Sequence, residues 1–98
     1  MPVLRFDRFT SDPGRTGELL ARRAALVAAV RTAVPGLIQT RLTRIDERTW
    51  VDTWLWESKE AALAAVAQAR AGAIPEVPAA FALTTDMTTE FAEVVDER

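Results

Sequence analysis

The chain has 98 residues, 49% of them hydrophobic, and a formal net charge of −2 at pH 7. This length allows one domain with a core of its own, over residues 1–98, and the acidic balance argues against nucleic acid as a main partner, because phosphate binding favours a basic surface. The chain contains no cysteine, histidine or tyrosine, so it forms no disulfide and lacks the residue types that most often act as thiol nucleophile, general base, metal ligand or haem ligand.

No segment of the sequence is typical of membrane insertion or export. A run of about 18 apolar residues, the length needed to cross a bilayer, does not occur. The first residues, Met1–Phe6, lack the charged region and apolar core of a signal peptide. We therefore expect a cytoplasmic protein without a membrane partner.

A strand and a helix are expected first along the chain. Val3–Phe9 alternates in hydrophobicity, as a strand with one buried face does. Apolar residues over Glu18–Val34 recur at the three- and four-residue spacing of a helix, which Pro35-Gly36 ends. The solvent side of this helix would carry Arg22, Arg23 and Arg31.

A hairpin and a second helix follow. Leu37–Ile45 alternates again, and the polar turn Asp46–Arg48 joins it to an aromatic strand that starts at Thr49, which indicates antiparallel neighbours. Ser58 stands where a helix N-cap belongs, and the helix would run to Gly72, a natural C-terminal stop.

The last expected elements are a short helix over Ala79–Leu83 and a strand over Met87–Val95. The complete order is β-α-β-β-α-β with one additional short helix before the final strand. This order predicts an α+β fold of the ferredoxin-like type, with a four-stranded antiparallel sheet and both main helices on one face.

All three tryptophans lie in the third strand, Thr49–Trp56, and alternation places them together on one face of the sheet. The two sets are Trp50, Asp52, Trp54 and Trp56 on one face, and Val51, Thr53 and Leu55 on the other. Helices of a 98-residue chain can cover only one of these apolar faces.

The face without helices would be an exposed apolar surface. It would carry Leu4, Phe6, Ile38, Leu42, Val51 and Leu55. A monomer rarely exposes a patch of this size, and a two-fold pairing of sheet against sheet would cover it. We therefore expect a homodimer.

The face toward the helices would be polar for a core. Besides the tryptophans it would carry Arg5, Asp7, Gln39, Arg41 and Asp52. Buried charges are costly unless they are paired, so this face is either a salt-bridged core or the wall of a ligand pocket. The same residues fit both interpretations.

Three segments of the chain form a recognisable set: Pro35-Gly36, the sequence Trp-Leu-Trp-Glu-Ser-Lys-Glu-Ala over residues 54–61, and Asp86–Val95. Together they resemble the antibiotic biosynthesis monooxygenase family of the dimeric α/β-barrel superfamily. The resemblance covers nearly the whole chain and implies the sheet-to-sheet dimer barrel. It also implies a pocket on the face that bears Asp7.

The family includes cofactor-independent oxygenases that convert polyketide-type phenols or anthrones into quinones, and haem-degrading enzymes. The haem degraders use an asparagine on strand one, a tryptophan in helix two and a histidine on the short helix that follows. Asp7, Ala65 and residues 78–80 stand at these places here. The resemblance therefore favours the oxygenases, and no cofactor or metal is expected.

In an oxygenase of this type, the aspartates and arginines of this face would take part in the reaction. Asp7 or Asp52 would take a proton from the substrate, and Arg5 or Arg41 would stabilise the resulting phenolate or enolate. The remaining substrate-binding candidates are Gln39, Trp50, Trp54, Trp56 and Phe81. A small aromatic molecule would be the substrate.

Two alternatives fit the same sequence. The domain could be a binding or interaction module without catalysis, or a cofactor-free cyclase or isomerase that acts on a polyketide. In the first alternative the tryptophans would fill the pocket themselves, as core or dimer packing, and each aspartate would be a structural ion-pair partner of an arginine.

Overall fold

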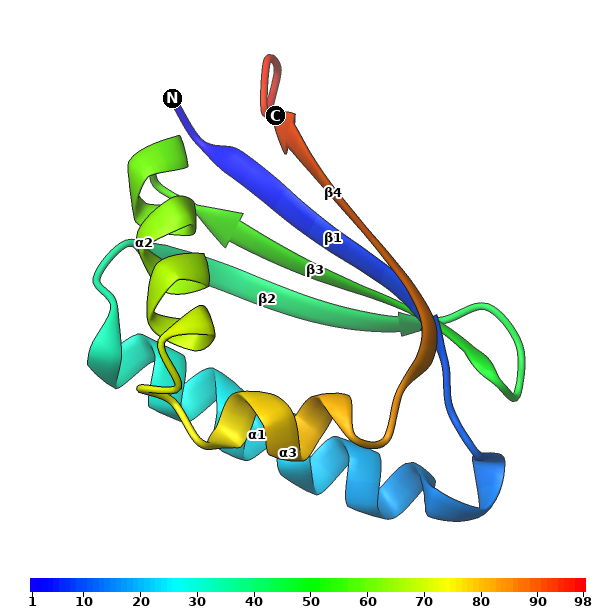
Figure 1. Ribbon diagram of the computed structural model, residues 1–98. Coiled ribbons are helices and arrows are strands. Elements are labelled where there is room, and N and C mark those ends of the chain that lie inside the picture. The colour runs from blue at the N-terminus through cyan, green and yellow to red at the C-terminus, as the bar shows by residue number, and fades with distance from the viewer.

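The computed structural model describes the whole chain, Met1–Arg98, as a sheet covered on one face by helices (Figure 1). The strands are β1 (Val3–Thr10), β2 (Leu37–Arg44), β3 (Thr49–Trp56) and β4 (Thr85–Glu93). The helices are α1 (Thr16–Ala33), α2 (Lys59–Arg70) and α3 (Glu76–Phe81), and a 3-10 turn η1 (Pro13–Arg15) precedes α1. No helix is long and apolar enough to cross a membrane.

The sheet has the strand order β2-β3-β1-β4, and every neighbouring pair is antiparallel. This confirms the predicted ferredoxin-like α+β fold. The short helix α3 begins at Glu76, three residues before the predicted start. A proline in the first helical turn is tolerated because its missing N–H would have no helical partner there, so Pro78 lies inside the helix instead of preceding it.

Strand β3 has the most regular burial pattern in the chain, alternating between buried and half-buried residues along its whole length. The buried set faces the helices. One core cluster joins Trp54 and Trp56 to α1, α2 and α3, and a second cluster at the other end of the strand joins Trp50 to Phe9, Leu19 and Leu83. Ser58 caps α2 by accepting a hydrogen bond from the Ala61 amide at 3.1 Å, as predicted.

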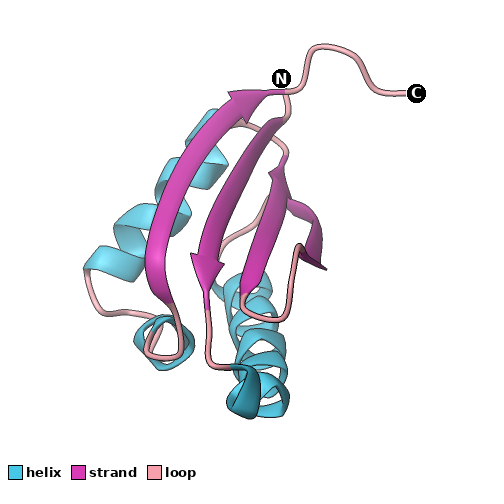
Figure 2. Ribbon diagram, turned by 90° about the vertical axis from the view of Figure 1, so that its right-hand side faces the viewer, coloured by secondary structure: helices cyan, strands magenta, loops and turns pink.

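The opposite face of the sheet carries no helix, as Figures 1 and 2 show. The strand register places Leu4 opposite Leu55 and Phe6 opposite Thr53 on this face. These side chains are half-buried in the single chain. The predicted bare, partly apolar face is therefore present.

Strand β2 differs from the prediction in the direction of its side chains. Gln39 and Arg41 pair with Leu55 and Thr53, so they lie on the bare face and not on the tryptophan face. Leu42 was expected on the bare face, but it pairs with Asp52 and packs against the cluster around Trp50.

A one-residue β-bulge causes this difference. Leu37 pairs with Trp56 and Gln39 pairs with Leu55, so Ile38 is the additional residue and the side-chain alternation shifts there. Leu37 and Leu42 are five residues apart and would face opposite sides of a regular strand. The bulge lets both pack on the helix side, and it turns Gln39 and Arg41 to the other side.

Gly36 fixes the turn that leads from α1 into β2. Its φ is +103°, a region that residues with a Cβ rarely adopt, and its carbonyl accepts a hydrogen bond from the Glu57 amide at 2.8 Å. A Cβ at this position would lie 2.8 Å from the Cβ of Ala61. The turn therefore ties the start of β2 closely to the first turn of α2.

Replacing Gly36 by alanine should lower the free energy of unfolding by more than about 1 kcal/mol, because both the backbone angle and the contact with Ala61 become unfavourable. Urea unfolding followed by tryptophan fluorescence measures this change. The matched control is Gly17→Ala in α1, where the added Cβ meets nothing within 4 Å. The free energy of unfolding of the control should rise by about 0.5 kcal/mol because alanine has the higher helix propensity. Equal losses of stability in the two variants would contradict the special requirement for glycine at position 36.

Candidate active site

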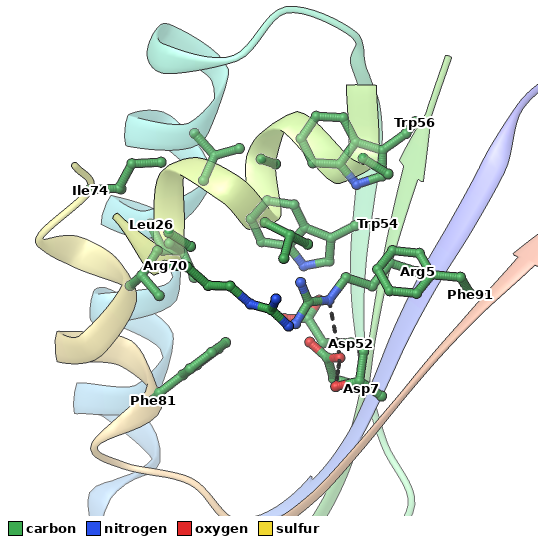
Figure 3. A pocket seen from close by; sticks show the side chains of 17 residues that line it. Arg5, Asp7, Leu26, Asp52, Trp54, Trp56, Arg70, Ile74, Phe81 and Phe91 are labelled. Carbon is green, nitrogen blue, oxygen red and sulfur yellow. Dashed lines mark hydrogen bonds and ion pairs between the residues drawn. The ribbon is translucent and has the colours of Figure 1, made fainter. Parts of the chain in front are cut away.

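A pocket of about 330 Å³ lies between the sheet and the helices (Figure 3). Its floor comes from β1, β3 and β4, its wall from α1 and α2, and its rim from α3. The volume is at the lower end of the range of about 300–1,000 Å³ typical of small-molecule sites. Of its 17 lining residues 12 are hydrophobic, so the few polar groups would orient a mostly apolar ligand.

Six of the nine predicted site residues line this pocket. They are Arg5, Asp7, Asp52, Trp54, Trp56 and Phe81. Gln39 and Arg41 do not, because the bulge turns them to the bare face, where both line a shallow groove beside Leu4 and Leu55. The prediction that they share a face with the tryptophans is wrong.

Trp50 also lies outside the pocket, although its side chain is on the predicted face of the sheet. It packs in the second core cluster with Phe9 and Leu19. The guanidinium carbon of Arg44 lies 4.4 Å from the centre of its ring and covers it from the β2 side. Trp50 is therefore a packing residue at the end of the sheet remote from the pocket.

Trp54 and Trp56 form one wall of the pocket. Their ring centres are 6.4 Å apart and their planes differ by 20°, which is a stacked arrangement. Opposite them α2 presents Ala62, Ala65 and Ala69, which recur at helical spacing and all line the pocket. Small side chains on the helix leave the space in front of the indoles open.

Asp7 is the most buried polar residue of the pocket floor. It is 6% exposed. Its Oδ1 accepts a hydrogen bond from the Thr89 hydroxyl at 2.7 Å and one from Arg5 Nε at 3.2 Å, whereas Oδ2 accepts none. No side-chain oxygen or nitrogen sealed from solvent lacks a partner, so this free oxygen is one that solvent in the pocket reaches.

Asp52 is held differently. Both of its oxygens accept hydrogen bonds from Arg23 of α1, Oδ1 from Nη2 at 2.9 Å and Oδ2 from Nε at 3.1 Å. Burial raises the pKa of the Asp52 carboxyl above its usual value, although the hydrogen bonds and charge of Arg23 act in the opposite direction. The nearby charge of Asp7 adds to the rise.

Four polar or aromatic residues of the site were not identified from the sequence. Thr89 and Phe91 of β4 line the floor, and the Phe91 ring lies 5.7 Å from the guanidinium carbon of Arg5. Arg70 comes from the last turn of α2. Arg23 was expected on the solvent side of α1 but reaches the sheet. Alternation in β4 could have indicated Thr89 and Phe91, because they stand opposite Asp7 and Arg5.

Comparison with known families agrees with this geometry. The family model described as antibiotic biosynthesis monooxygenase matches residues 2–77. The chain belongs to this family. The matched segment includes β1, β3 and α2, which contribute most of the pocket. No curated protein matches the sequence.

Several solved structures share the fold over nearly the full length of both chains. SnoaB from Streptomyces nogalater, a cofactor-independent oxygenase, is 26% identical with a TM-score of 0.72, over 98% of this chain and 95% of that one. A variant of MhuD with two manganese protoporphyrin IX molecules per active site is 27% identical with a TM-score of 0.67, over 98% and 97%. Rv0793 from Mycobacterium tuberculosis is 21% identical with a TM-score of 0.70, over 99% and 98%, and shows the fold alone.

The MhuD variant holds manganese protoporphyrin IX, but the residues that line the pocket of this chain do not fit a haem group. None of the lining residues is a histidine, cysteine, tyrosine or methionine, the side chains that usually ligate haem iron. The polar lining consists of arginines, aspartates and one threonine. These groups suit an organic anion or an acidic proton better than an iron centre.

Arg23 should offset much of the cost of burying the ionised Asp52 carboxylate. Arg23→Ala should lower the free energy of unfolding by about 3 kcal/mol at neutral pH, because it leaves Asp52 buried without its partner. Urea unfolding at several pH values measures this. The control is Arg31→Ala on the same helix, an exposed arginine that forms no ion pair, which should change stability little.

The pH dependence has a definite sign. The pKa of Asp52 is higher in the folded chain than its usual value, so ionised Asp52 opposes folding fully at pH values above the folded-state pKa. This opposition weakens as the pH falls through the folded-state pKa and is gone below the usual, unfolded-state value. The loss caused by Arg23→Ala should therefore shrink on acidification, and Asp52→Asn should recover part of it at neutral pH. If the loss of stability caused by Arg23→Ala stays constant with pH, the Asp52 carboxylate is not its cause.

Proposed function

We propose that this chain is a cofactor-independent oxygenase that binds a small aromatic, polyketide-like phenol or anthrone in the pocket between sheet and helices. Molecular oxygen would be the only co-substrate. Family membership and the likeness to SnoaB support the class of reaction. The mostly apolar lining of the pocket and its small volume support a planar substrate of few rings. The whole chain would act as one domain.

The observation that carries the proposal is the free oxygen of Asp7. Thr89 and Arg5 fix one oxygen of this carboxylate and leave the other directed at no protein donor. A general base must be within hydrogen-bond reach of the proton that it removes, and a bound substrate could supply that contact. In Asp52 both oxygens are already bound by Arg23, which makes it the second choice.

The proposed reaction starts with proton transfer from an acidic C–H or O–H of the substrate to Asp7. The resulting electron-rich anion would transfer an electron to oxygen, and recombination would give a peroxide at the same carbon. Loss of water from this peroxide converts a CH₂ group and O₂ into a C=O group and H₂O. The protein would supply the base, the orientation and a site shielded from bulk water.

Arg5 would stabilise the negative charge that develops on the substrate oxygen. Its Nε is bound to Asp7, and its terminal nitrogens have no protein acceptor. Trp54 would provide a flat surface for the substrate rings, opposite the alanine face of α2. Stacking on indole and a charge-assisted hydrogen bond are the interactions that an ionised phenol favours.

Asp7→Asn should lower the rate of oxygen consumption by about 100-fold or more, because the amide cannot accept the proton. The assay is oxygen uptake by metal-stripped protein with a panel of hydroxyanthrones and dihydroxynaphthalenes, corrected for the spontaneous rate. Asp96→Asn in the exposed C-terminal tail, where the carboxylate contacts only Arg98, is the matched control and should keep the full rate.

Other results would change the assignment. If Asp52→Asn abolishes turnover and Asp7→Asn does not, Asp52 is the base. If the wild-type protein binds these compounds, with quenching of tryptophan fluorescence, but consumes no oxygen, a binding module or a cyclase fits better than an oxygenase.

We also propose that two copies pair through the bare face of the sheet. Leu4, Phe6, Val51 and Leu55 share this face and are only half-buried in the single chain. Association would remove their remaining apolar surface from water, which is the usual driving force of a two-fold interface. Arg41 and Glu97, which line the same groove, offer opposite charges to such a partner.

Leu55→Lys should convert the dimer into a monomer, because it places a charge at the centre of this face. Light scattering coupled to size-exclusion chromatography at micromolar concentration measures the mass, and circular dichroism checks the fold. Ala21→Lys on the exposed side of α1 is the control and should remain dimeric. A monomeric wild-type protein would refute this pairing.

A further inference from the structure

The charges around the pocket do not balance. Asp7 is paired with Arg5 at 3.2 Å and Asp52 with Arg23 at 2.9 Å. Arg70 also lines the pocket, yet its guanidinium forms no ion pair within the chain. The region around the pocket thus contains three arginines and only two carboxylates, and Arg70 is the arginine without a carboxylate partner.

Helix geometry directs Arg70 into the pocket. Ala62, Ala65, Val66, Ala69 and Arg70 all line it, which is the spacing of one helix face over two turns. Figure 3 shows the Arg70 side chain extending from α2 into the pocket, toward Arg5. A cation in the last turn also suits the helix dipole, but an arginine that served only the dipole would gain nothing from turning toward another arginine.

Two guanidinium groups directed at one pocket repel each other, and because Arg70 is exposed, water screens part of this repulsion. An anion bound between or beside the two groups would turn the repulsion into attraction. Arg5 has Asp7, and Arg70 has no such partner in the chain. A ligand that carries a negative charge would supply it. The planar fork of a guanidinium binds a carboxylate through two parallel hydrogen bonds, so a carboxylate is the best match.

We infer that Arg70 binds a carboxylate on the aromatic substrate and thereby selects acidic substrates over neutral ones. This inference rests on the proposed function, since it assumes that the pocket binds an aromatic molecule. The reacting ring would lie at Trp54 and Asp7, and the acidic arm would extend toward the end of α2. Arg5 would remain available for the phenolate that forms during the reaction.

The test compares 6-hydroxy-2-naphthoate with its neutral amide, 6-hydroxy-2-naphthamide, by isothermal titration calorimetry. The two probes have nearly the same shape and differ in charge. Wild-type protein should bind the acid about tenfold more tightly or better, since a hydrogen bond to a charged group is worth about 1.5–3 kcal/mol and tenfold corresponds to about 1.4 kcal/mol. Arg70→Gln should reduce this ratio to about one and leave binding of the amide unchanged.

Two further variants control the result. Arg70→Lys keeps the charge but loses the fork, so it should give an intermediate ratio. Arg31→Gln removes an exposed arginine of α1 that does not line the pocket and should leave both affinities as in the wild type. Circular dichroism of each variant confirms that the fold is intact.

Each outcome bears on a different claim. Equal binding of acid and amide by the wild-type protein would overturn the role of Arg70 and leave the proposed oxygenase standing. An equal loss of both probes in Arg70→Gln would also overturn it, because shape and not charge would then be responsible. Binding of neither probe to the wild-type protein would overturn the aromatic pocket itself, and the inference with it.

Discussion

The burial of one face of β3 against the helices is the constraint on which the rest of the structure depends. Trp54 and Trp56 on this face join α1, α2 and α3 into one core. Asp52 occupies the same face between Trp50 and Trp54, so a carboxylate is built into the most buried strand of the protein. Such a group is tolerated only with a partner, and Arg23 supplies it from α1.

The two neighbouring carboxylates, Asp52 and Asp7, differ in how their oxygens are hydrogen-bonded. The Asp52 carboxylate is bound on both oxygens and contributes to the packing of α1 on the sheet. The Asp7 carboxylate, on the neighbouring strand and directly opposite Asp52 in the register, is bound on one oxygen only. Under the proposed function, the first of these carboxylates has a structural task and the second a chemical one.

The sequence was sufficient for the fold and for the part of the site that follows from strand alternation. Arg5 and Asp7 lie where period two places them, and so do Asp52 and the tryptophans. The prediction put Gln39 and Arg41 on the wrong face of the sheet because a single bulged residue reverses the alternation of side chains along β2. No pattern in the local sequence indicated this bulge. Arg23 could not be found because a long side chain on a helix reaches beyond its own face, and its direction depends on what lies opposite. Arg70 shares the face of α2 that carries Ala62, Ala65 and Ala69, but helical spacing alone does not show that this face lines a cavity.

The alanines of α2 have a consequence for how this fold could acquire new ligands. The methyl groups of Ala62, Ala65 and Ala69 line the cavity in front of the indoles, and none of these residues takes part in the Arg5–Asp7 or Arg23–Asp52 ion pair. Exchanging one of them for a larger or smaller side chain would reshape the cavity in steps of a few atoms while the two ion pairs stay intact. Relatives built on the same frame can therefore diverge in ligand size through one helix, without rebuilding the strands that hold the reactive groups.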